Sequence, residues 1–211
     1  MFKVFFALFI LFIFSCQRNN NPISSDNTEI FFPTTIGSSW NYSFVDTTFF
    51  IFYPDSFIVK TDTIHLEIVS NHLQSNSKRE IIGLLGSGNS IDSLFLNYSS
   101  DTLFFYTKNS SKYFTSELVL IFPLKEGKKW KYRPFDYEVS TIDSLKLPFG
   151  SLKDVFVVKQ LLKRVGNSGG ENIYYIKPGI GIVKFVYRLW TTMRDTNYRK
   201  IWQLINYSES K

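Results

Sequence analysis

Hydrophobic and polar residues alternate with a period of two along much of the chain after residue 30. Ile64, Leu66 and Ile68 are separated by single polar residues, and the stretch 183–189 sets apolar side chains opposite basic ones. Successive side chains of a β-strand point to opposite faces, so this alternation gives a strand one apolar and one polar face. The pattern is typical of an antiparallel sheet that faces water on one side.

Short strands with polar breaks are predicted over most of the chain, and no amphipathic helix longer than two turns is visible. The breaks are rich in Gly, Ser, Asn and Asp, as at 86–89 and 166–170. We expect an all-β fold, a mainly antiparallel curved sheet or a sandwich or half-barrel. The candidate strands are 40–46, 48–53, 63–70, 79–85, 91–97, 102–107, 117–122, 129–133, 137–146, 154–164, 172–177, 182–190 and 198–207.

The first sixteen residues break this pattern. Lys3 precedes an unbroken apolar run over 4–14, and Ser15 and Cys16 follow. This order is that of a secretory signal peptide, and 11 apolar residues are too few to span a bilayer, which takes about 20. The segment 13–16 also resembles the lipobox of bacterial lipoproteins. In that family the chain is cut before a diacylglyceryl cysteine, whose amine is then acylated, commonly with palmitate.

We therefore predict a signal peptide over 1–15, lipidation at Cys16 and attachment to a membrane through that lipid. The alternatives are a secretory signal with an incidental cysteine, or a short membrane anchor. Residues 16–30 are polar and rich in Asn and Ser, so we expect a flexible tether before a β domain over 31–211. Gln17 in place of Asp favours the outer membrane, and the lack of an acidic cluster favours its periplasmic face.

Composition and charge narrow the classes of function. The full chain of 211 residues has a formal charge of +6, and the mature chain of 196 residues keeps +5 without a block of Lys and Arg. This modest charge suits anionic lipid or polysaccharide surfaces better than nucleic acid. Cys16 is the only cysteine, so the fold has no internal disulfide and depends on its hydrophobic core. Aromatic residues make up 18% of the chain, which favours strands.

One motif occurs twice. The pattern Phe-Pro-x3-Gly-x2-Trp-x-Tyr covers 32–42 and returns 90 residues later over 122–132. Pro fixes an extended start, Gly permits a turn, and the Trp and Tyr project onto one face of the outgoing strand. This internal repeat predicts two related halves, 31–120 and 121–211. The four aromatic residues are expected to be buried strand-start anchors, or else exposed platforms for sugars: Trp40, Tyr42, Trp130 and Tyr132.

Three motifs in the second half suggest a family. FPLKxGxxWxY covers 122–132, PxGxxKDV covers 148–155 and YYxxPGIGIV covers 174–183. In this order they resemble a group of uncharacterised bacterial lipoproteins related to TapB-like domains of unknown function. The resemblance covers roughly 121–190, while 47–120 lacks the second and third motifs. It implies an exported, lipid-anchored all-β domain with a broad curved sheet, and it implies no reaction and no catalytic residues.

Catalytic and metal-binding patterns are weak. His65 and His72 are the only histidines, and on a regular strand they would face opposite sides, so we expect surface histidines and no metal site. No nucleophile elbow is recognised, since the Gly-Asn-Ser-Gly-Gly stretch at 166–170 has the composition of a turn and the segment 86–90 precedes a predicted strand, which makes it a turn as well. Gly179-Ile180-Gly181 is followed by strand and not by the helix that a dinucleotide site needs. We expect no enzyme activity and no cofactor.

The leading hypothesis is a non-catalytic, lipid-anchored module of the cell envelope that acts by interaction or as a structural part. Its partner would be an envelope protein, a lipid or a glycan, and not nucleic acid. Two alternatives remain open. A curved sheet lined with apolar side chains could carry a lipid or another hydrophobic ligand, and exposed Trp and Tyr could bind polysaccharide.

Overall fold

The computed structural model describes residues 31–73, 79–87, 90–99, 101–107, 117–165, 168–190 and 196–210. The predicted signal peptide over 1–15, Cys16 and the tether lie outside these residues. Within them, no helix has the length and apolar character needed to cross a membrane.

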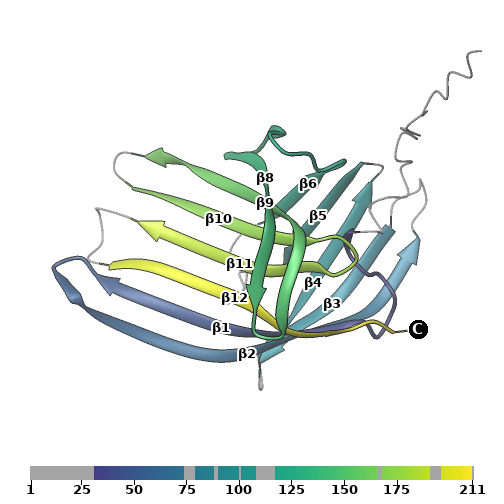
Figure 1. The fold of residues 1–211 in the computed structure, drawn as a ribbon, viewed down its shortest axis with the longest axis horizontal. Helices are drawn as coiled ribbons and strands as arrows, with labels where there is room; N and C mark the ends of the chain where they lie inside the picture. The colour runs from purple at the N-terminus through teal and green to yellow at the C-terminus, as the bar shows by residue number, and fades with distance from the viewer. Residues whose placement is uncertain are drawn as a thin grey trace, which may run out of the picture.

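The described residues form twelve strands in one antiparallel sheet (Figure 1), which confirms the predicted all-β class. The sheet order is β6-β5-β4-β3-β2-β1-β12-β11-β10-β9-β8-β7. The strands are β1 (Ser39–Phe50), β2 (Tyr53–Leu73), β3 (Arg79–Ser87), β4 (Ser90–Ser99), β5 (Thr102–Thr107), β6 (Leu118–Ile121), β7 (Lys129–Tyr132), β8 (Phe135–Leu147), β9 (Gly150–Val165), β10 (Ser168–Lys177), β11 (Gly181–Trp190) and β12 (Thr196–Ser208).

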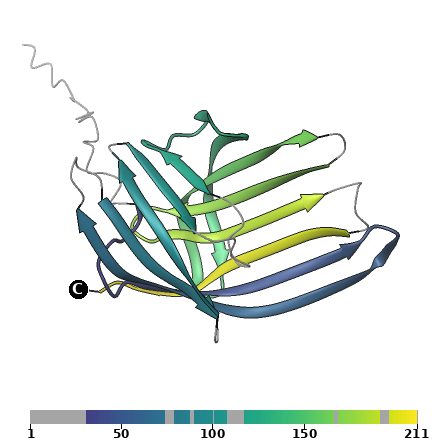
Figure 2. The same ribbon diagram turned by 180° about the vertical axis from the view of Figure 1, so that it is seen from behind.

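The connection between β6 and β7 determines the shape of the sheet. These two strands stand at opposite ends of the sheet order, yet only residues 122–128 join them. Such a segment spans at most about 30 Å. The sheet must therefore curl until its ends approach each other, and the two opposite views show a curved, nearly closed barrel-like sheet (Figures 1 and 2). Of the predicted shapes, the curved sheet close to a barrel is the one observed.

Side chains on the inner face fill the space that the curl encloses. On β1, Trp40, Tyr42 and Phe44 are buried and alternate with less buried residues, and Ile64, Leu66 and Ile68 continue this face on β2. The predicted alternation on β2 is thus correct. Other strands add buried side chains to the same core: Ile81, Leu85, Leu94, Leu96, Leu103, Phe105, Val139, Val158, Tyr174, Ile176, Phe185, Trp202 and Leu204. Burial of this apolar surface is the main source of stability.

The far part of the β8–β9 hairpin crosses the neighbouring strands and covers a second face (Figure 1). The ladder of this hairpin keeps one register but omits the pair Asp143–Asp154, and the φ of Asp154, 52°, is in the left-handed region. Ile142 packs against a cluster formed by Val157, Ile173 and Val186. Strands β10 and β11 are therefore buried on both faces near this crossing, which explains why Ile173 and Val186 break the simple alternation.

The hairpin of β1 and β2 is longer than the sequence pattern predicts. We expected breaks at residue 47 and around Tyr53–Asp55, whereas β1 is continuous and β2 begins at Tyr53. The ladder pairs Phe50 with Tyr53 and then Phe49 with Phe57, so residues 54–56 form a bulge within the strand. A bulge near the start of a strand accommodates proline, and the pairing resumes beyond it. The stretch 54–62 is consequently a strand that the pattern missed.

Gly181 is predicted to be essential to the packing of this core. A Cβ atom there would lie 2.7 Å from a ring carbon of Phe32, and its φ is +95°. Gly181→Ala should lower the free energy of unfolding by about 3 kcal/mol, because strain and overpacking add. Gly127→Ala is the matched control, since its φ is +78° and a Cβ would contact nothing within 4 Å. It should cost about 1 kcal/mol. Equal losses in urea unfolding would contradict the packing role.

Candidate functional site

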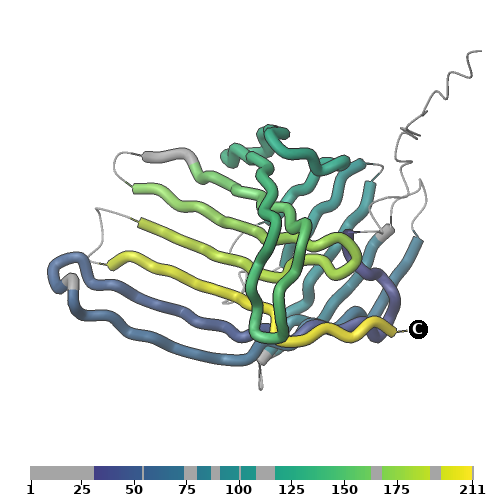
Figure 3. The backbone as a smooth tube through the Cα atoms, in the orientation of Figure 1, coloured from purple at the N-terminus to yellow at the C-terminus, as the bar shows by residue number. Residues whose placement is uncertain are grey.

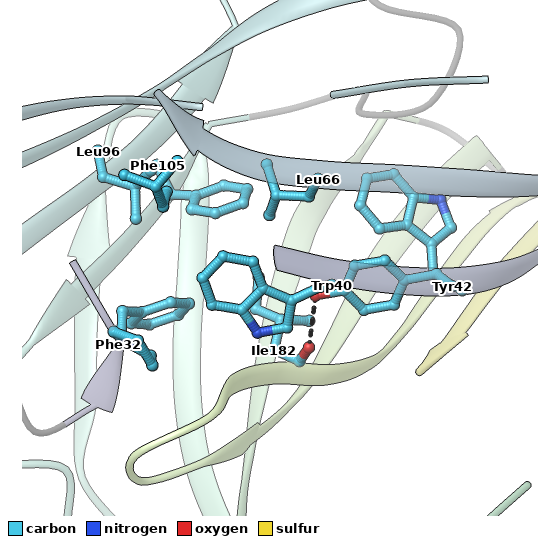
Figure 4. A pocket seen from close by; sticks show the side chains of 10 residues that line it. Phe32, Trp40, Tyr42, Leu66, Leu96, Phe105 and Ile182 are labelled. Atoms are coloured by element: carbon cyan, nitrogen blue, oxygen red, sulfur yellow. Dashed lines mark hydrogen bonds between the residues drawn. The ribbon is translucent and has the colours of Figure 1, made fainter. Parts of the chain in front are cut away.

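Trp40 and Tyr42 lie in the interior and hold the turn between β10 and β11. The Trp40 indole Nε1 donates a hydrogen bond of 2.7 Å to the carbonyl of Ile180. The Tyr42 hydroxyl donates one of 2.9 Å to the carbonyl of Ile182, which Figure 4 shows as a dashed line. Each aromatic residue is only 2% exposed. Burial raises the pKa of Tyr42 well above its ordinary value, so the phenol remains a neutral donor. Both residues are therefore buried, and their hydrogen bonds join β1 to the turn between β10 and β11.

The turn that receives these bonds contains the GxG sequence. Gly179 and Gly181 both have positive φ, and the Ile180 amide donates to the carbonyl of Lys177 at 3.0 Å. The residues after it continue as β11. The sequence is therefore a tight turn between two strands, as predicted.

Trp130 and Tyr132 follow a turn with the same backbone geometry, although their surroundings differ. The Gly127 amide donates to the Val139 carbonyl at 2.8 Å, as the Gly37 amide donates to that of Ile68 at 2.8 Å. Each glycine has positive φ. These equivalent bonds tie the start of β7 to β8 and the start of β1 to β2.

The second aromatic pair lies on the terminal strand β7 and is half-buried. The Trp130 ring stacks on Tyr137 at 5.0 Å with an 8° interplanar angle. Tyr132 meets the edge of Phe104 at 5.8 Å, which links β7 to β5 across the gap between the sheet ends. One face of Trp130 is consequently covered, and the pair serves packing near the closure of the sheet.

The apolar cavity beside the first aromatic pair is almost completely filled. Its volume is about 10 Å³, close to that of one water molecule. Side chains from several strands line it: Phe32, Trp40, Tyr42, Leu66, Leu96, Phe105, Ile182 and Trp202 (Figure 4). Ligand pockets commonly measure about 300–1,000 Å³. This part of the interior is a packed core with no room for a lipid chain.

A buried polar network bridges the two ends of the sheet, and the sequence analysis missed it. Gln160 on β9 is 1% exposed. Its Nε2 donates to the Glu117 carbonyl at 2.7 Å and to the Tyr137 hydroxyl at 2.6 Å. Its Oε1 accepts from Asn172 Nδ2 at 2.6 Å and from the Tyr174 hydroxyl at 3.1 Å. The amide thus uses its full capacity of two donors and two acceptor sites.

The position of Glu117 gives this network its importance. Glu117 directly precedes β6, one end of the sheet, whereas Gln160 and Tyr137 belong to β9 and β8 near the other end. Arg133, just after β7, adds an ion pair of 3.1 Å to the Glu117 carboxylate. Burial raises the pKa of Tyr137 above its ordinary value, so its hydroxyl stays protonated. Side chains therefore connect the sheet ends where no β6–β7 ladder is found among the described strands.

A cleft of about 130 Å³ lies beside this network. Phe135, Leu162, Tyr187 and Leu189 are among the residues that line it. Its volume compares with an apolar cavity of about 150 Å³ that accepts benzene. The cleft could hold a small molecule, but it is too small for an acyl chain together with a head group.

Neither histidine belongs to a catalytic or metal-binding cluster. His65 Nδ1 lies 2.8 Å from Asn41 Oδ1, and its Nε2 lies 3.5 Å from Glu67 Oε2, all at an exposed surface. A bulge between Ile68 and Ser70 shifts the alternation, so exposed His72 shares the face of His65 and does not lie opposite it as expected. In the described ranges, no three His, Cys, Asp or Glu residues are placed to hold a metal ion.

The remaining predicted residues fall in turns or outside the described ranges. Ser87 ends β3 and Ser90 begins β4, so the segment 86–90 connects two strands as expected, with residues 88 and 89 undescribed. Cys16, the predicted lipidation site, also lies outside the described residues.

No family model and no curated protein matches the chain. Solved structures are similar to it, among them two bacterial proteins. One, from Bacteroides fragilis, is described as an exported protein with a YmcC-like fold; it has 10% identity and a TM-score of 0.49 over 85% of this chain and 99% of its own. The other, from Parabacteroides distasonis, is described as a lipoprotein; it has 13% identity and a TM-score of 0.45 over 85% of this chain and 98% of its own.

Gln160 is predicted to be the most sensitive polar position of the described core. Gln160→Leu keeps the volume but removes the hydrogen bonds that the Gln160 amide makes to the Glu117 carbonyl, Asn172 and Tyr174. We expect a loss of about 3 kcal/mol in urea unfolding, because buried polar groups are left unsatisfied. Lys159→Leu, at an exposed neighbouring position, is the matched control and should change stability by about 0.5 kcal/mol or less. A Gln160→Leu variant as stable as this control would refute the role of the network.

Proposed function

We propose that this chain is a lipid-anchored protein of the cell envelope whose β domain works without catalysis, as an interaction or structural module. The observation that carries the proposal is the filled interior, with a cavity of about 10 Å³ where the curved sheet would otherwise enclose a ligand. A domain with a packed interior offers its surface to partners. The polar groups around Gln160 bond to one another, and the cleft that Gln160 and Asn172 border has a volume of only about 130 Å³.

The location follows from the sequence of the N-terminal segment. Lys3, the apolar run and Ser15–Cys16 support export, cleavage before Cys16 and attachment of acyl chains. Two or more acyl chains give stable anchoring, whereas a single chain gives only marginal binding. Gln17 supports a place on the outer membrane, and the lack of an acidic cluster in the tether supports its periplasmic face.

We further infer that the two halves of the domain derive from one repeated unit, with the boundary near residue 121. The equivalent turns at Gly37 and Gly127 support this inference. So does the sheet order, in which β1–β6 and β7–β12 each form a block of consecutive neighbours. The equivalent tryptophans of the two halves have different contacts, since Trp40 donates a hydrogen bond across the interior while Trp130 packs at a sheet end.

Carrier and polysaccharide-binding functions receive less support. A carrier needs an apolar cavity larger than the 10 Å³ and 130 Å³ spaces described above. A sugar platform needs an accessible aromatic face, and Trp40 and Tyr42 are buried. Only the half-buried Trp130 and Tyr132 could contribute to such a surface.

Replacing Cys16 tests the lipid anchor. In cells fed a labelled palmitate analogue, Cys16→Ser should abolish labelling and release the protein from the membrane fraction, because the only thiol that can be alkylated is gone. Ser15→Ala is the control, since it keeps both the cysteine and a small residue before the cut. A Cys16→Ser protein that still carries label and sediments with membranes would end the lipoprotein assignment.

A further inference from the structure

The tip of the β1–β2 hairpin exposes an unusual amount of apolar surface. Among the described residues, fifteen large apolar side chains are exposed, and seven of them lie within residues 49–59. Phe52 in the turn is 72% exposed and Tyr53 is 69% exposed. The exposed set is Phe49, Ile51, Phe52, Tyr53, Phe57, Ile58 and Val59. Apolar patches of this kind on a soluble domain mark a binding surface.

The tip is apolar on both of its faces. Phe49 and Phe57 are paired across the two strands with ring centroids 6.5 Å apart, while the neighbouring Ile58 points to the other face. A hairpin that docks on a protein surface needs one apolar face. An element that is apolar all round is suited to an apolar medium that surrounds it, as the hydrocarbon edge of a bilayer does.

Charged residues follow directly behind the apolar tip. Asp46 on β1 is the cross-strand neighbour of Lys60 on β2 and of Lys200 on β12. In the next row, Arg199 on β12 is the cross-strand neighbour of Thr47 on β1 and of Arg188 on β11. These rows lie about 7–10 Å from Phe49 along the strand. They contain four basic and two acidic side chains: Lys60, Arg188, Arg199, Lys200, Asp46 and Glu171. The positive excess complements anionic lipid head groups.

We propose that residues 49–59 insert into the interfacial layer of a lipid bilayer, with the basic rows at the level of the head groups. Aromatic residues favour this layer, and Tyr53 has the amphipathic ring typical of it. Asp55 is exposed within the bulge, and its carboxylate keeps the insertion shallow. The domain then has a second attachment beside the lipid on Cys16, so this inference rests on the proposed anchor.

The geometry of the chain allows both attachments in one membrane. The described chain begins at the end of the molecule opposite the hairpin tip, as the tube drawing shows (Figure 3). The segment from Cys16 to Phe31 reaches about 50 Å when extended, while β2 alone has a contour of about 70 Å. A domain held at both ends would lie along the membrane or inclined to it. The lipid on Cys16 holds the domain close to the bilayer, so the hairpin is at a high effective concentration near the lipid. Even weak insertion of the hairpin then gives a second attachment to the membrane.

Fluorescent labels on the lipidated mature protein test the proposal. Lipidation occupies Cys16, so Phe52→Cys provides one free thiol for an environment-sensitive nitrobenzoxadiazole probe. Phe149→Cys, at an exposed residue in the β8–β9 turn, is the matched control. The proteins are reconstituted into vesicles of phosphatidylethanolamine and phosphatidylglycerol with and without brominated acyl chains. We expect the probe at 52 to be quenched by brominated lipid and about threefold less accessible to iodide than the probe at 149.

Charge substitution provides a second measurement. Phe57→Asp should reduce quenching of the probe at 52 by brominated lipid about twofold or more, because a carboxylate disfavours insertion. Phe149→Asp should leave it unchanged. Equal iodide accessibility at 52 and 149 would overturn the proposal. Protection from iodide without quenching by brominated lipid would overturn it as well and would indicate a protein contact. An intact mass without acyl chains would instead refute the anchor, so the two failures are distinguishable.

Discussion

A single sheet without a helical layer must cover its own apolar face, and the structure depends on how it does so. The described strands bury one face of each half by curling, and the seven-residue link between β6 and β7 forces the sheet ends together. No ladder joins these ends among the described residues. Gln160 joins them instead, because its amide binds the carbonyl before β6 and the hydroxyls of Tyr137 and Tyr174. A buried network of this kind stabilises only when every member is satisfied.

The same constraint explains the role of the aromatic anchors. Trp40 and Tyr42 stand on β1 but bind carbonyls of the β10–β11 turn, so they hold two distant parts of the curl at a fixed separation. Phe32 packs against Gly181 at a position where no side chain would fit. Large rings then occupy the space between, and the cavity beside these described residues measures only about 10 Å³. This packing agrees with the proposal that the outer surface and the hairpin tip make the contacts of the domain.

Much of the architecture could be predicted from local pattern. The alternation with a period of two predicted the all-β fold class. The spacing of Gly37, Trp40 and Tyr42 indicated a turn followed by a strand whose aromatic residues are buried. The extension of β2 could not be predicted, since Pro54 and Asp55 are typical of a break and only pairing with β1 carries the strand past them. The burial of Val186 on the second face was equally hidden, because it depends on the β8–β9 hairpin crossing from elsewhere in the chain.

The polar network was invisible for a related reason. Gln160 directly follows the exposed Lys159 in its strand, and polar residues in a strand are usually exposed to solvent. The one sequence signal for the burial of Gln160 was its position two residues after Val158, which places both side chains on the inner face of the strand. The closing partner, Glu117, is 43 residues away, so the bond follows from the curl of the sheet and not from local sequence. The exposed apolar tip was hidden too, since 49–59 has the same composition as a buried strand.

Native mass spectrometry of residues 17–211, which lack the predicted lipidation site, after secretion into a bacterial periplasm tests the filled interior most directly, alongside organic extraction of the purified protein. The account predicts the mass of the polypeptide alone and an extract without lipid, because neither the 10 Å³ cavity nor the 130 Å³ cleft has room for an acyl chain with its head group. A lipid or other apolar compound bound at one copy per chain would contradict it and would make this protein a carrier.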